Sequence, residues 1–124
     1  MLLHKEITDI ILNSFYEVYN TLGYGFLEKV YENALLVELR KRGLNCFSQH
    51  RINVNYKEET VGVYFADIIV ENKVIIEVKA SMLHENFEYQ LLNYLKATNI
   101  EVGLLLGFGK EPEFLRKIYS NNRK

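Results

Sequence analysis

The sequence has one cysteine, no long uninterrupted hydrophobic segment and almost no net charge. The single cysteine, Cys46, excludes an intrachain disulfide and a zinc site built from cysteines. No segment approaches the roughly 20 apolar residues of a membrane span, and the N-terminus lacks an apolar core of signal-peptide length. We therefore expect a protein of a reducing, cytoplasmic setting with no membrane partner.

The formal charge of −1 excludes a global field that steers the protein onto nucleic acid, so any polyanion would have to be held locally. Basic residues outnumber acidic ones near the C-terminus, where a solvated surface explains them equally well. These residues are Lys110, Arg116, Lys117, Arg123 and Lys124. The composition is otherwise that of an ordinary globular protein, without repeats or linkers, and residues 1–124 are expected to form a single domain.

Hydrophobic spacing predicts two helices before the first strand. Apolar residues recur at helical spacing over residues 4–22, and Gly23 ends that segment. A second helix is expected over residues 27–42, where Gly43 follows a basic last turn. The two segments together predict an N-terminal helical hairpin.

After the hairpin the apolar period changes to two, which is typical of strands. A strand with one solvated face is expected over residues 47–56, and a return strand follows a turn at residues 57–59. A third helix over residues 84–98 separates two strongly apolar strands and would make them parallel. The other expected strands cover residues 61–70, 74–80 and 102–106, and residues 114–119 form a final strand or helix. This order predicts an α/β or α+β fold, with helices against a mixed sheet.

Charged residues interrupt the two apolar strands on either side of residues 71–73. Side chains alternate along a strand, so Glu77 and Lys79 share a face. A three-residue turn with Asn72 in a left-handed conformation would set the register of the two strands. Asp67 would then lie opposite Glu77 and point the same way. Two carboxylates and an ammonium group would meet at one place.

Two adjacent carboxylates repel each other unless a divalent cation lies between them. Oxygen ligands suit Mg²⁺ or Mn²⁺, which can activate a water and neutralise charge that develops on a phosphorane. The Lys79 ammonium would orient that water or stabilise the same charge. The alternative is that Asp67 and Glu77 face solvent, or that Glu77 pairs with Lys79.

Two further features bear on this group of charges. Glu28 begins the second helix, where the helix dipole favours a carboxylate, and helix capping alone would account for it. Gln90 and Tyr94 are four residues apart and share one face of the third helix. That helix directly follows the charged strands, which would place this face next to the acids.

These residues together carry a family resemblance. The sequence resembles the GxxExxY proteins, whose motif is present as Gly25, Glu28 and Tyr31, within the PD-(D/E)XK nuclease superfamily. The matching segments extend over nearly the whole chain, at residues 22–28, 34–39, 61–62, 67–79, 90–98 and 103–109. The resemblance implies a restriction-endonuclease-like core, in which helices flank a mixed sheet.

The resemblance also implies a catalytic set. Asp67 and Glu77 would be the superfamily's two acids, and Lys79 its lysine. The remaining members match the acid of the first core helix and the glutamine-and-tyrosine motif of RecB-type nucleases; they are Glu28, Gln90 and Tyr94. Ala66 stands before the first acid, where the superfamily has a loosely kept proline.

The implied cofactor is Mg²⁺ or Mn²⁺, and the implied reaction is hydrolysis of phosphodiester bonds in DNA or RNA. The implied metal ligands are Asp67, Glu77, Glu28 and the Val78 carbonyl. Against this stands the near-neutral charge of a small chain, since phosphate contacts normally supply most of the affinity for a duplex. Two alternatives are a nuclease fold that binds or regulates without turnover and an interaction protein that acts in an oligomer. A homodimer would help a nuclease, because two sites could address two strands.

Overall fold

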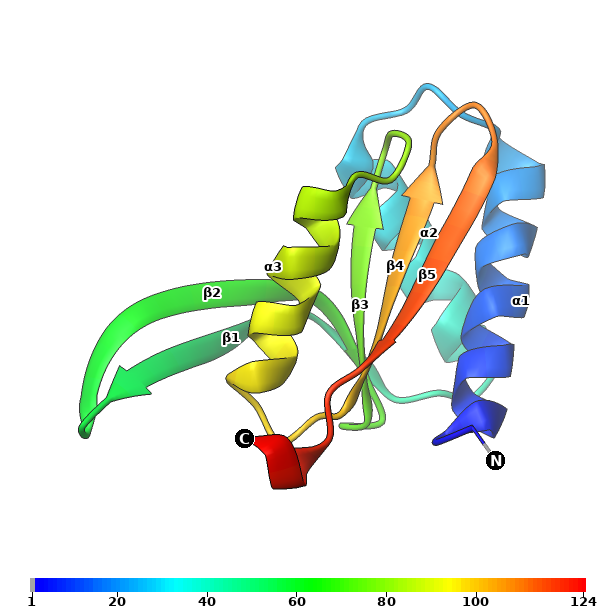
Figure 1. The fold of residues 1–124 in the computed structure, drawn as a ribbon. Helices are drawn as coiled ribbons and strands as arrows, with labels where there is room; N and C mark the ends of the chain where they lie inside the picture. Colours follow the sequence, from blue (N-terminus) through cyan, green and yellow to red (C-terminus); the bar gives the residue numbers. More distant parts are fainter. Residues whose placement is uncertain (1) are drawn as a thin grey trace.

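The computed structural model describes residues 2–124, in which helices cover both faces of one five-stranded mixed sheet (Figure 1). The strands, in sheet order, are β1 (Cys46–Tyr56), β2 (Glu59–Val70), β3 (Val74–Lys79), β4 (Val102–Phe108) and β5 (Pro112–Ile118). The helices are α1 (Lys5–Leu22), α2 (Glu28–Lys41), α3 (Glu85–Lys96) and the short 3-10 helix η1 (Asn121–Arg123). The predicted α+β fold is confirmed, and the last predicted element is a strand. No helix within the described residues is long and apolar enough to cross a membrane.

α1 and α2 form the predicted hairpin and cover one face of the sheet. Ile11 and Phe15 of α1 and Leu35 of α2 are fully buried in the same core cluster as the inward side chains of β3 and β4. Gly23 ends α1 with φ 69°, a conformation that L side chains rarely adopt, and its N–H donates to the Tyr19 carbonyl. The hairpin therefore begins and ends near the positions that the sequence indicates.

α3 covers the opposite face and connects β3 to β4. These two strands are parallel, as the helical crossover predicts, while β1 with β2, β2 with β3 and β4 with β5 are antiparallel. Every side chain of β4 is buried, and Lys79 is the one residue of β3 that is not. β3 and β4 therefore form the centre of the sheet, covered on both faces.

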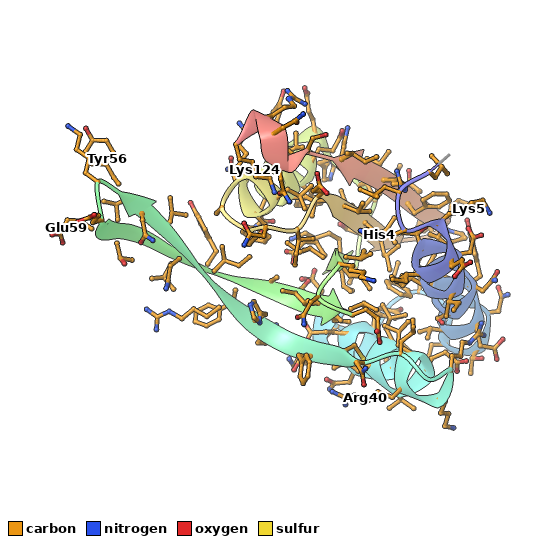
Figure 2. The ribbon with its side chains drawn as sticks, turned by 90° about the horizontal axis from the view of Figure 1, so that it is seen from below. His4, Lys5, Arg40, Tyr56, Glu59 and Lys124 are labelled. Carbon is orange, nitrogen blue, oxygen red and sulfur yellow. The ribbon has the colours of Figure 1, made fainter. Side chains whose placement is uncertain are left out.

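β1 and the outer part of β2 form a two-stranded arm that projects beyond α3, with Tyr56 and Glu59 at its tip (Figure 2). The two-residue turn at Lys57 and Glu58 has positive φ at both positions. The prediction of one solvated face holds at Ile52, which is buried between the exposed Arg51 and Asn53. It is wrong toward the tip of the arm, where Tyr56 is exposed on the face expected to be covered. The reason is that β2 pairs with β3 only over residues 68–70, so the arm extends beyond the core.

The turn between β2 and β3 has the predicted length and register. Residues 71–73 connect the strands, and Glu71 and Asn72 have φ values of 54° and 53°. Val70 pairs with Val74, and the register continues to residues 68 and 76. Positions 67 and 77 come next along the same register.

The C-terminal basic residues are partly engaged within the chain. Lys117 Nζ pairs with Glu88 Oε1 at 2.7 Å, and Lys124 Nζ donates to the carbonyls of Thr98 and Ile100, each at 2.8 Å. These contacts weaken the case for a cationic patch at this end of the chain.

Candidate active site

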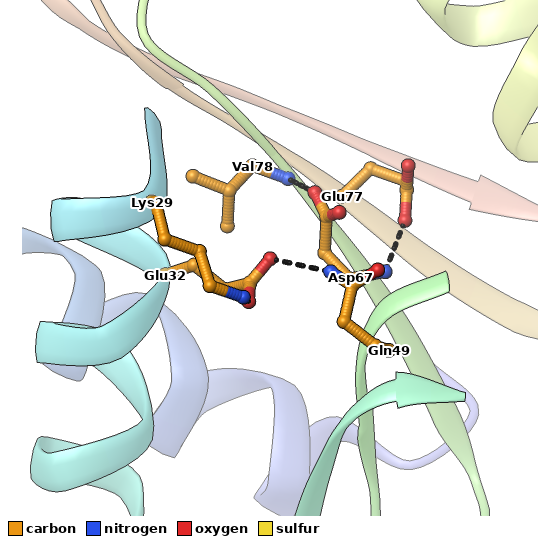
Figure 3. Close-up of polar contacts among 6 residues, drawn as sticks. All are labelled: Lys29, Glu32, Gln49, Asp67, Glu77 and Val78. Carbon is orange, nitrogen blue, oxygen red and sulfur yellow. Dashed lines mark hydrogen bonds and ion pairs between the residues drawn. The ribbon is translucent and has the colours of Figure 1, made fainter. Parts of the chain in front are cut away.

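Asp67 and Glu77 lie where the sheet forks. β2 and β3 pair as far as Ile68 and Ile76, and β2 then leaves β3 and continues into the arm. Beyond this point the carboxylates of the two acids accept hydrogen bonds from backbone N–H groups of the opposite strand. Asp67 N donates to Glu77 Oε2 and Val78 N donates to Asp67 Oδ2, each at 2.8 Å (Figure 3). The two carboxylates are therefore brought together, as the turn register requires.

Burial makes both carboxylates difficult to ionise. Glu77 is 2% exposed, and burial, followed by the negative charge of Asp67, raises the pKa of Glu77 to about 8. Burial also raises the pKa of Asp67 to about 6, although the hydrogen bond from Val78 N opposes the rise and the Glu32 carboxylate adds to it. The alternative that Glu77 faces solvent is wrong.

α2 carries two acids to the same fork. Glu28 Oε2 accepts a hydrogen bond from Ala80 N at 3.2 Å, so this carboxylate contacts the chain just after β3. One turn further along α2, the Glu32 side chain is buried. Its carboxylate accepts a hydrogen bond from Gln49 Nε2 at 3.0 Å and forms an ion pair with Lys29 Nζ at 2.5 Å (Figure 3). The fork is thus lined by carboxylates from a helix as well as from both strands.

Glu32 and Gln49 were not among the residues expected at the site. Glu32 lies four residues after Glu28 on the stripe of α2 that also carries Leu35 and Leu39, and all but Glu28 are buried. An acid within an apolar helix stripe is the signal that could have identified it. Gln49 has φ 52° and interrupts the β1–β2 pairing opposite Asp67. No feature of the sequence around Gln49 indicates that its side chain lies at the fork.

A row of hydrogen bonds connects β3 to α3. Lys79 Nζ donates to Gln90 Oε1 at 3.2 Å, and Gln90 Nε2 donates to Tyr94 OH at 3.0 Å. Lys79 Nζ also lies 4.6 Å from the centroid of the Phe87 ring, which favours a cation. No ion pair joins Lys79 to a carboxylate of residues 2–124, so the alternative pairing with Glu77 is wrong.

The face of α3 that carries Gln90 and Tyr94 is directed toward Asp67 and Glu77, as expected. Burial raises the pKa of Tyr94 to about 12, with the negative charges of Glu77 and Asp67 as the next contributions. A neutral phenol therefore lies close to the carboxylate pair, and it accepts its hydrogen bond from Gln90.

Tyr31 shapes the loop that leads to Glu28. Tyr31 is fully buried, and its hydroxyl donates a hydrogen bond to the Gly23 carbonyl at 2.7 Å and accepts one from Phe26 N at 3.2 Å. Gly25, between these two positions, has φ 109°. The glycine and tyrosine of the sequence motif thus fix the path of the chain into α2, and with it the position of Glu28.

Within residues 2–124, no group of three or more His, Cys, Asp and Glu side chains has the arrangement of a ready-made metal site. The donors at the fork nevertheless suit a hard cation. Glu28, Asp67 and Glu77 each use one carboxylate oxygen to accept a backbone N–H, and the second oxygen takes part in no hydrogen bond within the described chain. The raised pKa values of Asp67 and Glu77 mean that a positive charge between them would relieve an unfavourable arrangement.

Comparison with known proteins gives one match, to a family model. The model described as the PD-(D/E)XK nuclease superfamily matches residues 5–118, from the first residue of α1 to the last residue of β5. No curated protein and no solved structure matches the chain. The matched range contains the fork and all of the residues described around it.

Proposed function

The chain belongs to the PD-(D/E)XK nuclease superfamily, and from this premise we propose that it is a metal-dependent nuclease that hydrolyses phosphodiester bonds of DNA or RNA. The observation that carries the proposal is the pair of hydrogen bonds that holds Asp67 and Glu77 together at the sheet fork. Within the superfamily we assign the chain to the GxxExxY proteins, on the basis of Gly25, Glu28 and Tyr31.

In this proposal the ligands of Mg²⁺ or Mn²⁺ are Asp67, Glu77 and Glu28, together with the Val78 carbonyl. A bound divalent cation of this kind supplies an activated water and neutralises charge on the phosphate. The chain contributes carboxylates whose hydrogen bonds to backbone N–H groups fix their orientation before a cation arrives. The elevated pKa of Glu77 implies that it gives up a proton when the cation binds.

Lys79 is proposed to orient the attacking water or to stabilise the negative charge that develops on the phosphate oxygens. Gln90 Oε1 accepts a hydrogen bond from the ammonium group, which also lies 4.6 Å from the centroid of the Phe87 ring. Tyr94 OH accepts a hydrogen bond from Gln90 Nε2, so Tyr94 supports the position of Lys79 indirectly, through Gln90. Gln90 and Tyr94 therefore act as positioning residues for the lysine.

The test is cleavage of single-stranded, duplex and branched DNA and RNA with added Mg²⁺, compared with EDTA. The purified protein is expected to cleave at least one of these substrates, and Lys79→Ala is expected to lower the rate by about a hundredfold or more. Cleavage that persists unchanged in the variant would reveal a contaminating nuclease. Absence of cleavage of every substrate by the wild type would contradict the proposal and favour a module that binds without turnover.

The proposal extends to the organisation of the protein. We propose that residues 1–124 form a single domain. We also propose that the protein acts as a homodimer, in which two sites could act on two strands. A cytoplasmic setting suits the one cysteine, Cys46, which is a buried free thiol. Sedimentation at micromolar concentration tests the dimer, and a monomer that still cleaves would remove this part of the proposal alone.

A further inference from the structure

A groove lies between the projecting arm and α3. It has a volume of about 500 Å³, which is within the range of small-ligand sites, and the residues that line it come from β1, β2 and the C-terminal end of α3. They are Asn53, Val54 and Asn55 from β1, Tyr64 from β2, Asn93 and Lys96 from α3, and the adjacent Ala97. Figures 1 and 2 show the two elements that form its walls, with the arm extending past α3.

The lining has the chemistry of a nucleobase site. The amide of Asn93, an exposed lining residue on α3, takes part in no hydrogen bond within the described chain, so its donors and its acceptor remain free for a ligand. Side-chain amides are suited to the donor and acceptor pattern of base edges. No acidic residue of the described chain lines the groove, which leaves it open to a phosphate as well as to a base.

An aromatic ring and a cation complete the groove. The Tyr64 side chain is 41% exposed, so a large part of it remains available for stacking. Lys96 is exposed and is one of the lining residues, so its flexible side chain supplies a positive charge on the α3 side of the groove. Stacking, amide hydrogen bonding and one cation are the three interactions with which proteins hold single nucleotides.

The groove continues directly from the candidate active site. Gln90, Asn93 and Ala97 follow one another at helical spacing on a single face of α3, so the groove begins about 5 Å along the axis from Gln90. Across the gap, the rings of Tyr64 and Tyr94 lie 5.4 Å apart, centroid to centroid. One strand of nucleic acid can therefore reach both places.

We propose that this groove between the arm and α3 binds an unpaired nucleobase, with its neighbouring phosphate, of the strand whose phosphodiester lies at the sheet fork. The inference rests on the proposed nuclease function and gives it a substrate class, single-stranded nucleic acid or a single-stranded segment. In a duplex the base edges are paired and the base faces are stacked, so neither the Asn93 amide nor the Tyr64 ring would find a free partner.

The test is binding, measured separately from cleavage. Fluorescence anisotropy with a short fluorescein-labelled single strand, in EDTA, compares the wild type with Asn93→Ala/Lys96→Ala. The matched control is Asn33→Ala/Lys41→Ala, which removes the same two residue types from exposed positions of α2. The groove variant is expected to bind about tenfold more weakly, while the control binds like the wild type. A strand with abasic sites should bind the wild type about tenfold more weakly than the intact strand.

Equal binding by the groove variant and the control would overturn the inference, and so would equal binding of intact and abasic strands. Tighter binding of a fully paired duplex than of the single strand would also overturn it. The nuclease proposal fails in a different way, by absence of Mg²⁺-dependent cleavage. Loss of binding in the groove variant without any cleavage by the wild type would leave a single-strand binding site on an inactive fold.

Discussion

The two acids at the sheet fork are arranged in a way that does not favour stability of the metal-free protein. Glu77 is buried beside Asp67, and the pKa of each carboxyl is raised by that environment. Two neighbouring anions in a buried site cost free energy unless a cation or a proton compensates them. The arrangement therefore supports the proposal that the two acids bind a cation.

This arrangement predicts a pH dependence of stability for the metal-free protein. The folded state holds a proton on Glu77 up to pH about 8, whereas the unfolded chain releases it near the ordinary value of 4.5. The stabilisation is therefore fully present below pH about 4.5 and is lost as the pH rises through about 8. Urea unfolding in EDTA should give a lower free energy of unfolding at alkaline pH than at mildly acidic pH.

Glu77→Gln provides the matched control for that measurement. The amide keeps an oxygen that can accept the hydrogen bond from Asp67 N but has no proton to release in this range. The fall in stability between mildly acidic and alkaline pH should be smaller in the variant. A wild type and variant with the same pH profile would contradict the raised pKa of Glu77.

At the scale of elements, the turn at residues 71–73 sets the position of the two acids. Its length and the left-handed conformation of Asn72 follow from the sequence, because the apolar strands on either side are short and the break between them is polar. The arm is different. A period of two shows that a segment is a strand, but it does not show whether another element covers the strand. The exposure of Tyr56, which lies on the face expected to be covered, could therefore not be foreseen.

The turn also gives a prediction about backbone conformation. Asn72 has φ 53°, which a β-branched residue adopts only with difficulty and glycine adopts freely. Asn72→Val is expected to lower the free energy of unfolding by about 1 to 2 kcal/mol, and Asn72→Gly to change it by less than about 1 kcal/mol. Urea unfolding compares the two. Equal destabilisation by valine and glycine would show that Asn72 is not held in this conformation.

At the scale of the whole molecule, the sheet fork lets side chains from both helical layers approach one site. α2 lies on one face of the sheet and α3 on the other, and Glu28 and Gln90 contact the end of β3 from these two elements. The helical crossover allowed the parallel β3–β4 pair to be predicted, and with it the mixed sheet. Glu32 and Gln49 could not be placed in the same way, because their position depends on how β1 and α2 pack at the fork.

The central claim is that Asp67 and Glu77 together hold a divalent cation, and binding of Mn²⁺ followed by electron paramagnetic resonance tests it most directly. At alkaline pH, where Glu77 is ionised, the wild type is expected to bind Mn²⁺. Asp67→Asn and Glu77→Gln should each weaken binding at least about tenfold, while Glu38→Gln, on α2 in a pair with Arg42, should have no effect. A wild type that binds no Mn²⁺, or site variants that bind it as tightly as Glu38→Gln, would contradict the account.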